Sequence, residues 1–212
     1  MAKGPVFKLT PENTLKAELK AGKLRQVYCI YGEETFLANM YADRIISTAG
    51  CEQSDGMNFL KLRGAPDPHS LSDFTESLPF FAEHKCVKLI DLDAEAMDND
   101  SHKELLRLIE ELPDTTVMVI CQTGLEIDDM KPKAKTKKLI QTVEKCGMVC
   151  KMQFLPAAMT AAMAAKKAQK SGCTLSQENA LYLSDLCGRS LTLIQNEVDK
   201  LCACQQSGEI SR

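Results

Sequence analysis

Apolar residues along most of the chain occur in short β-rich runs that alternate with stretches of helical spacing. The first run, Val27 to Tyr31, ends at Gly32, and apolar residues then recur at three- and four-residue steps as far as Ile45. The same alternation continues along the chain. The predicted strands are 27–31, 57–62, 86–90, 115–121 and 148–152. Strands that alternate with helices in this way predict an α/β domain with a parallel five-stranded sheet and flanking helices.

The run from Thr115 to Cys121 is the most continuous and the richest in β-branched residues. Such strands occur where both faces of a sheet are covered by helices. We therefore expect this run at the centre of the sheet.

Cap residues predict where the helices of this domain begin and end. Thr10 before Pro11 predicts a leading helix with proline at its first position, and Gly22 ends it. Ser101 and Glu104 form a capping-box pattern at the start of another helix. The remaining predicted helices cover about 36–45, 68–78 and 133–145.

The character of the chain changes at Pro156. No β-rich run follows, and three amphipathic helical patterns cover about 157–170, 176–187 and 190–205. A chain of 212 residues exceeds the usual size of one domain. We expect an α/β domain over 1–155 and a small three-helix domain over 156–212.

The net charge of −3 argues against a protein that grips nucleic acid with its whole surface, so any DNA contact must be local. No apolar run has the length of a signal peptide or a membrane span. We expect a cytoplasmic protein with no membrane partner.

Ten cysteines in a chain of this size predict reduced, packed thiols rather than a disulfide framework. Four of them lie within apolar runs: Cys29, Cys86, Cys121 and Cys150. The most closely spaced cysteine pairs have no histidine nearby in the sequence, so we expect no zinc site. His69, His84 and His102 lie in polar or loop-like settings and indicate no catalytic site.

A parallel sheet whose first loop enters a helix is the usual place for nucleotide phosphates. A phosphate loop needs a second glycine, a lysine and a hydroxyl at fixed distances from its first glycine. Counting from Gly32, those places hold Leu37, Ala38 and Asn39. The loop is therefore degenerate, and we expect neither a bound nucleotide cofactor nor ATP hydrolysis.

Asp91 and Asp93 follow the predicted strand 86–90, which is the outline of a magnesium-binding strand end. Acidic residues commonly end strands and face water. Without a phosphate loop, we expect no metal site here.

An aromatic pair follows the predicted helix 68–78, in the segment Leu78-Pro79-Phe80-Phe81. Phenylalanines are usually buried, so the residues alone favour a core role. An exposed pair would mark a binding site for a partner protein.

Lysines are concentrated at one place on this acidic chain: Lys131, Lys133, Lys135, Lys137 and Lys138. DNA phosphates are one target for such a cluster. A solvated helix face is the alternative, and without interleaved aromatic residues the sequence favours it.

The segments Val27 to Leu37, Leu78 to Lys85, Lys137 to Leu139 and Gly188 to Leu201 together resemble the delta subunit family of the bacterial DNA polymerase III clamp loader. In order, they are similar to its opening strand and degenerate loop, its clamp-contacting wedge and next strand, its basic helix and its closing helix. Ser190 departs from the acidic residue that the family often has there.

This resemblance implies an AAA+ like α/β domain, a helical lid domain and a third, helical collar domain, which would begin where this chain ends. It implies a subunit of the DNA-directed DNA polymerase holoenzyme that has no catalytic activity of its own and acts in DNA replication. The implied partners are the sliding clamp (beta), the ATPase subunits (gamma or tau), delta prime, and DNA in the loaded complex. Leu78, Pro79, Phe80 and Phe81 would insert into the clamp and favour its open ring.

Two other interpretations stay open. A P-loop-type ATPase or nucleotide-binding domain would bind ATP, which an ATP-binding assay would detect. A non-clamp adaptor with the same fold predicts that Phe80 and Phe81 are both buried, whereas the clamp wedge requires at least one of them to be exposed.

Overall fold

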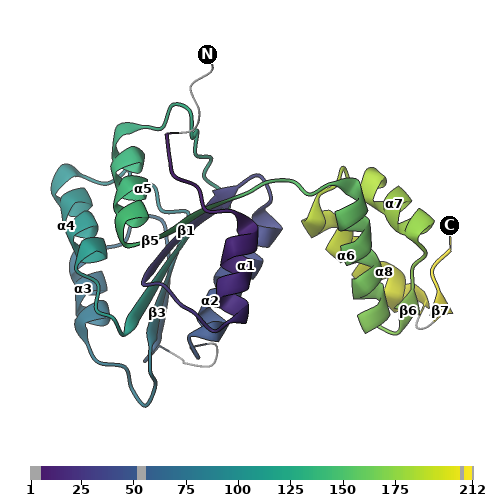
Figure 1. Ribbon diagram of the computed structural model, residues 1–212, viewed down its shortest axis with the longest axis horizontal. Helices are drawn as coiled ribbons and strands as arrows, with labels where there is room; N and C mark the ends of the chain where they lie inside the picture. The colour runs from purple at the N-terminus through teal and green to yellow at the C-terminus, as the bar shows by residue number, and fades with distance from the viewer. Residues whose placement is uncertain (1–5, 52–55, 206–207, 212) are drawn as a thin grey trace. The chain divides into compact units, whose positions relative to one another are not determined.

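The computed structural model describes residues 6–51, 56–205 and 208–211, which fall into two units, Met1–Met152 and Gln153–Arg212. The first unit contains one parallel sheet, with strands in the order β2-β3-β4-β1-β5 (Figure 1). Its strands are β1 (Val27–Gly32), β2 (Phe59–Arg63), β3 (Lys85–Ile90), β4 (Thr116–Cys121) and β5 (Gly147–Met152). The predicted five-stranded parallel sheet is confirmed, and the most apolar strand, β4, lies at its centre.

Helices cover both faces of this sheet. The helices are α1 (Glu12–Lys20), α2 (Thr35–Thr48), α3 (Pro68–Glu76), α4 (Asn99–Glu110) and α5 (Ala134–Cys146). Figure 1 shows α1 and α2 on one face and α3, α4 and α5 on the other. Every residue of β3 and β4 is buried, because these strands have neighbours on both sides and helices on both faces.

Two predicted helix starts are wrong in detail. The N-cap of α4 is Asp98, whose carboxylate accepts hydrogen bonds from the backbone N–H groups of Asp100 and Ser101, both at 2.9 Å. Ser101 therefore lies inside the first turn, since Asp98 offers an equally good cap earlier in the chain. Pro11 has an extended ψ of 143° and is the N-cap of α1 rather than its first helical residue.

Two glycines allow β1 and β5 to pair closely. At Gly32, where φ is +129°, a Cβ atom would lie 2.2 Å from the carbonyl oxygen of Met152. At the other end of the ladder, a Cβ atom on Gly147 would lie 2.0 Å from the carbonyl oxygen of Val27. Both ends of this strand pair therefore require a residue without a side chain.

The second unit contains α6 (Ala157–Lys170), α7 (Gln177–Leu186) and α8 (Leu191–Gln205), which are the three predicted helices. It also contains two paired parallel strands, β6 (Cys173–Thr174) and β7 (Gly208–Glu209). The sequence did not predict these two strands, because a strand of two residues has no β-rich run. No helix in the described part of the chain is long and apolar enough to cross a membrane.

Replacing Gly32 by alanine should lower the free energy of unfolding by about 3 kcal/mol, because the new methyl group collides with the β5 backbone at a strained φ. Urea denaturation measures this loss. Gly22→Ala is the matched control: Gly22 also has a positive φ, of +70°, but no atom lies within 4 Å of its Cβ position, so only the strain of about 1 kcal/mol remains. Equal losses in the two variants would contradict the close-approach argument.

Candidate functional site

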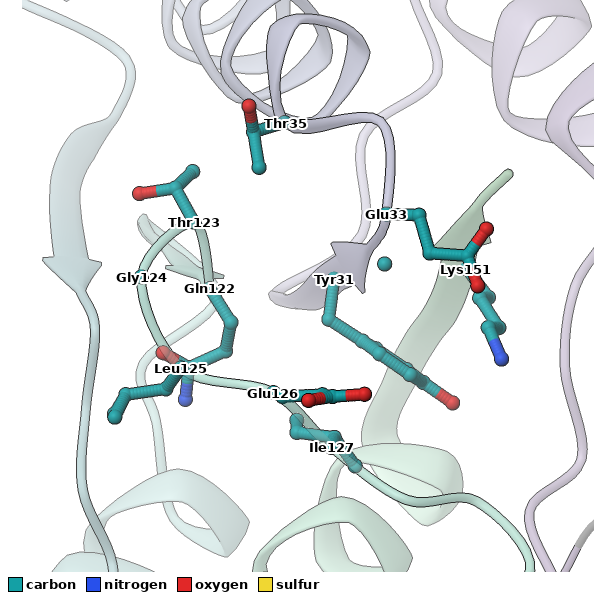
Figure 2. A pocket seen from close by; sticks show the side chains of 11 residues that line it. Tyr31, Glu33, Thr35, Gln122, Thr123, Gly124, Leu125, Glu126, Ile127 and Lys151 are labelled. Atoms are coloured by element: carbon teal, nitrogen blue, oxygen red, sulfur yellow. The ribbon is translucent and has the colours of Figure 1, made fainter. Parts of the chain in front are cut away.

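The carboxyl ends of β1, β4 and β5 border a pocket of ≈ 260 Å³ (Figure 2). This is the edge at which open parallel sheets commonly bind ligands. Its lining comes from the loop after β1, the segment after β4 and one residue of β5: Tyr31, Gly32, Glu33, Thr35, Gln122, Thr123, Gly124, Leu125, Glu126, Ile127 and Lys151. Lys151 is paired with Asp129, at 2.9 Å between Nζ and Oδ2.

The N-terminus of α2, where a phosphate would bind, already holds a carboxylate of the chain. Glu34 is the N-cap and is 2% exposed, and its Oε1 accepts a hydrogen bond of 3.2 Å from the backbone N–H of Phe36. The Glu34 side chain thus places an oxygen acceptor at the helix N-terminus, where a phosphate oxygen lies in nucleotide-binding proteins.

The positions where a phosphate loop has its ligands serve the fold instead. Leu37 and Ala38 are buried, so a side chain at position 38 points into the core rather than toward a phosphate. The side-chain amide of Asn39 donates to the carbonyl oxygen of Thr35 within α2, at 3.2 Å. Gly32 is needed for the approach of β5. These contacts are consistent with a degenerate loop.

Asp91 joins the ends of three neighbouring strands. It follows β3, has a φ of +52°, and its Oδ1 accepts hydrogen bonds of 2.7 Å from the backbone N–H groups of Thr123 and Gly124, after β4. Its Oδ2 also pairs with the guanidinium of Arg63, at the end of β2. The carboxylate has well-placed donors within the chain and acts as a structural tie.

Burial alone would raise the pKa of Asp91, but the hydrogen bonds from Gly124 and Thr123 and the charge of Arg63 outweigh it, so that the pKa is lowered. Asp93 likewise has a local role, since its Oδ1 accepts from the backbone N–H groups of Glu95 at 3.0 Å and Ala96 at 3.3 Å. Within the described residues, no group of three or more histidine, cysteine, aspartate or glutamate side chains could hold a metal ion.

One buried histidine and three buried thiols lie in settings that oppose nucleophilic chemistry: His102, Cys29, Cys121 and Cys150. His102 is 4% exposed within α4, contrary to the polar setting expected from sequence, and burial lowers its pKa. Burial raises the pKa of Cys29 and Cys150 to about 12 and that of Cys121 to about 11. A thiolate forms with difficulty at such sites.

The aromatic pair lies in an exposed loop, residues 77–84, which we call the aromatic loop. Phe81 is 96% exposed, Phe80 is 55% exposed and Leu78 is 84% exposed, while Pro79 is half-buried. The two phenyl rings pack edge to face, with centroids 4.6 Å apart. The core role that the residues alone favoured is therefore wrong for Phe80 and Phe81.

Two buried polar side chains hold the aromatic loop. The amide group of Asn58, just before β2, donates to the carbonyl oxygen of Phe80 and accepts from its N–H, each at 2.7 Å. The ammonium group of Lys85 donates to the carbonyl oxygen of Phe74 at 2.9 Å and to the hydroxyl of Ser77. Sequence reasoning missed both residues.

Four lysines of the cluster are exposed and point to solvent: Lys131, Lys133, Lys137 and Lys138. None of them takes part in an ion pair among the described residues. Lys135 differs, because it is half-buried and donates to the carbonyl oxygen of Met97. The exposed positive charge is concentrated before and within the first turns of α5.

Residues 28–148 match the model of the family described as DNA polymerase III, delta subunit. The chain belongs to this family. The matched residues include the degenerate loop, the aromatic loop and the lysine cluster. Among curated proteins, the chain is 26% identical over 194 residues to DNA polymerase III subunit delta of Bacillus subtilis, which covers 87% of this chain and 53% of that protein. The chain thus spans about half the length of this delta-family relative.

Solved structures share the fold. The DNA clamp loader delta protein YqeN of Bacillus subtilis aligns with a TM-score of 0.59 and 23% identity, covering 93% of this chain and 59% of that chain. A DNA polymerase III gamma subunit-related protein of Thermotoga maritima has a TM-score of 0.57 and 14% identity, and the alignment covers 91% of this chain and 61% of that chain. The RuvB Holliday junction branch migration motor of the same organism has a TM-score of 0.61 and 12% identity, covering 93% and 62%. The expected AAA+ like fold and the resemblance to the delta family are confirmed.

The stabilisation contributed by Asp91 should depend on pH. The pKa of Asp91 is lower in the folded state than in the unfolded chain, where it is about 4. The Asp91 carboxylate therefore contributes its full stabilisation above about pH 4, and this stabilisation is lost as the pH falls through the lower pKa of the folded state. Asn tolerates a positive φ, so Asp91→Asn removes the charge with little change of backbone. Wild type should exceed this variant by about 1 kcal/mol in unfolding free energy at pH 7, and the difference should narrow below about pH 4. A difference independent of pH down to pH 3 would contradict this account.

Proposed function

We propose that this chain binds a ring-shaped sliding clamp through the aromatic loop, with Leu78, Pro79, Phe80 and Phe81 as the contact residues, and favours the open state of the ring. The exposure of Phe80 and Phe81 is the observation that carries this proposal. A rigid, exposed aromatic pair next to another exposed apolar residue is the composition of an interface hot spot.

The loop favours binding energetically in two ways. Each phenylalanine transferred from water into an apolar pocket gains about 2 kcal/mol. The anchored backbone reduces the conformational entropy lost on association, because the loop is already ordered before it binds. Binding would open the ring only to the extent that the loop fits the open state better than the closed state.

ATP would be used by partner subunits rather than by this chain. The Glu34 carboxylate at the N-terminus of α2 and the buried Ala38 support this part of the proposal, since they leave no place for a γ-phosphate. Nucleotide bound by the gamma or tau subunits, assembled with delta prime, would then control access of the aromatic loop to the clamp. The same residues argue against the P-loop-type ATPase interpretation, and the exposed loop argues against an adaptor with buried phenylalanines.

We further propose that Lys131, Lys133, Lys137 and Lys138 contact DNA phosphates in the loaded complex. Their exposure, their lack of ion-pair partners among the described residues and their position at the positive end of α5 support this. Lys135 is left out of the contact set, because its ammonium group is bound within the fold.

The double substitution Phe80→Ala and Phe81→Ala should weaken binding to the purified sliding clamp of the same source by at least about 2 kcal/mol, which is roughly a 30-fold rise in Kd. Calorimetry or surface plasmon resonance measures it.

Leu186→Ala is the control, because Leu186 is 67% exposed in the other unit and its loss should leave clamp affinity unchanged. Wild-type affinity in the phenylalanine variant would place the contact elsewhere. No binding by the wild-type chain would overturn the proposal itself.

The double substitution Lys137→Glu and Lys138→Glu should weaken DNA binding by the chain and reduce the steepness of its salt dependence by about 0.9 for each phosphate that is no longer neutralised. Fluorescence anisotropy with a primed duplex at several salt concentrations measures both. Lys16→Glu with Lys20→Glu reverses the same charge on α1, where both lysines are exposed, and serves as the control. Equal effects from the two pairs would mean that only net charge matters.

A further inference from the structure

The backbone of the aromatic loop adopts a conformation that its own residues disfavour. Phe81 has a φ of +50°, in the left-handed region that bulky side chains rarely adopt. Such a conformation costs about 1–2 kcal/mol and persists only where surrounding contacts fix it. Because the side chain of Phe81 is 96% exposed, its own packing does not supply those contacts.

The side chain of Asn58 supplies contacts one residue earlier. Its amide donates to the carbonyl oxygen of Phe80 and accepts from its N–H, as a neighbouring strand would. The backbone of Asn58 is itself fixed, because its main-chain carbonyl oxygen accepts a 2.7 Å hydrogen bond from the N–H of Cys86, in β3. Asn58 thereby connects the middle of the aromatic loop, at Phe80, to the sheet.

Lys85 acts at a different place. Its ammonium group is bound to Phe74 and Ser77 and lies 4.1 Å from the centre of the Phe74 ring, so it fixes the end of α3 rather than the aromatic pair. The hydrogen-bonded contacts to the Phe80 backbone therefore come from Asn58 alone among the bonds of the described residues.

We propose that Asn58 is a positioning residue that holds the Phe80–Phe81 backbone in its clamp-binding conformation through the paired hydrogen bonds of its amide. This inference rests on the proposed clamp-binding function. Asn58 is 6% exposed, so it acts through Phe80 rather than by touching the clamp.

Asn58→Asp tests the paired hydrogen bonds by making one of them depend on protonation. The ionised carboxylate still accepts from the N–H of Phe80 but repels its carbonyl oxygen. The protonated carboxyl donates its O–H to that oxygen and restores the pair. Burial raises the pKa of a carboxyl group, which brings this change toward neutral pH.

Clamp affinity of Asn58→Asp should fall about tenfold below wild type at pH 8 and return to within about threefold at pH 5.5, since one lost buried hydrogen bond corresponds to roughly a factor of ten. Asn99→Asp is the matched control, because Asn99 is exposed at the start of α4 and its replacement adds the same charge. His84, in the aromatic loop, and Lys85, at the start of β3, are unchanged in wild type and in both variants, so a pH effect that wild type and Asn99→Asp share does not come from position 58.

A second measurement tests the positioning without the clamp. Chymotrypsin cleaves after phenylalanine and needs a flexible loop, so Asn58→Asp should be cut in the aromatic loop several-fold faster than wild type at pH 8. Asn58→Ser has a side chain that is one bond shorter, so its hydroxyl does not reach the Phe80 backbone and both hydrogen bonds are lost. It should be cut faster and bind the clamp more weakly at every pH, and it replaces Asn58→Asp if that variant does not fold.

The outcomes separate the two proposals. Loss of affinity at pH 8 with recovery at pH 5.5, together with faster cleavage, supports the positioning role. Wild-type affinity and cleavage in both variants, or a loss in Asn58→Asp that is the same at both pH values, overturns it. A wild-type chain that does not bind the clamp overturns the proposed function, while the cleavage rates still decide whether Asn58 holds the loop.

Discussion

The close approach of β1 and β5 determines how the rest of the first unit is arranged. At Gly32 the two backbones leave no room for a side chain, and the carbonyl oxygen of Met152 then accepts from the N–H of Glu34 at 3.2 Å. That contact turns the chain directly from β1 into α2 and places the Glu34 carboxylate at the start of the helix. The geometry of one strand pair therefore accounts for the short turn between β1 and α2, at the edge where open parallel sheets commonly bind ligands.

Charged side chains at the strand ends and within β3 form ion pairs and hydrogen bonds that connect neighbouring elements. Asp91 connects segments that follow three strands, and Lys88 reaches from the buried middle of β3 to Asp43 on α2, at 2.6 Å. Residues that resemble a metal site in the sequence thus bind backbone amides and neighbouring side chains. In contrast, the aromatic loop presents apolar groups to water and has its polar anchors beneath the surface. This arrangement is the opposite of the usual distribution, and the proposed clamp contact depends on it.

The periodic features of the fold could be predicted from sequence, because strands such as β4 and helices such as α8 carry a repeating apolar pattern. Features that depend on a single hydrogen bond could not. Asp98 and Ser101 are both good caps, and only the fold decides between them. β6 and β7 are too short to have a pattern.

The candidate site was predictable in its composition but not in its exposure. The sequence locates Phe80, Phe81 and the lysines, yet burial is set by distant segments. Lys135 is held by Met97, and the aromatic loop by Asn58, which lies 22 residues from Phe80. A single asparagine before a strand has no sequence pattern that predicts its hydrogen bonds to the distant Phe80 backbone.

The capped start of α2 also has a thermodynamic consequence. A protein that binds nucleotide in its folded state gains stability as the nucleotide concentration rises, through mass action. Here the group at the helix end, the Glu34 side chain, is covalently part of the chain, so its effective concentration is constant. The contribution of this cap to folding therefore does not change with the concentration of any ligand.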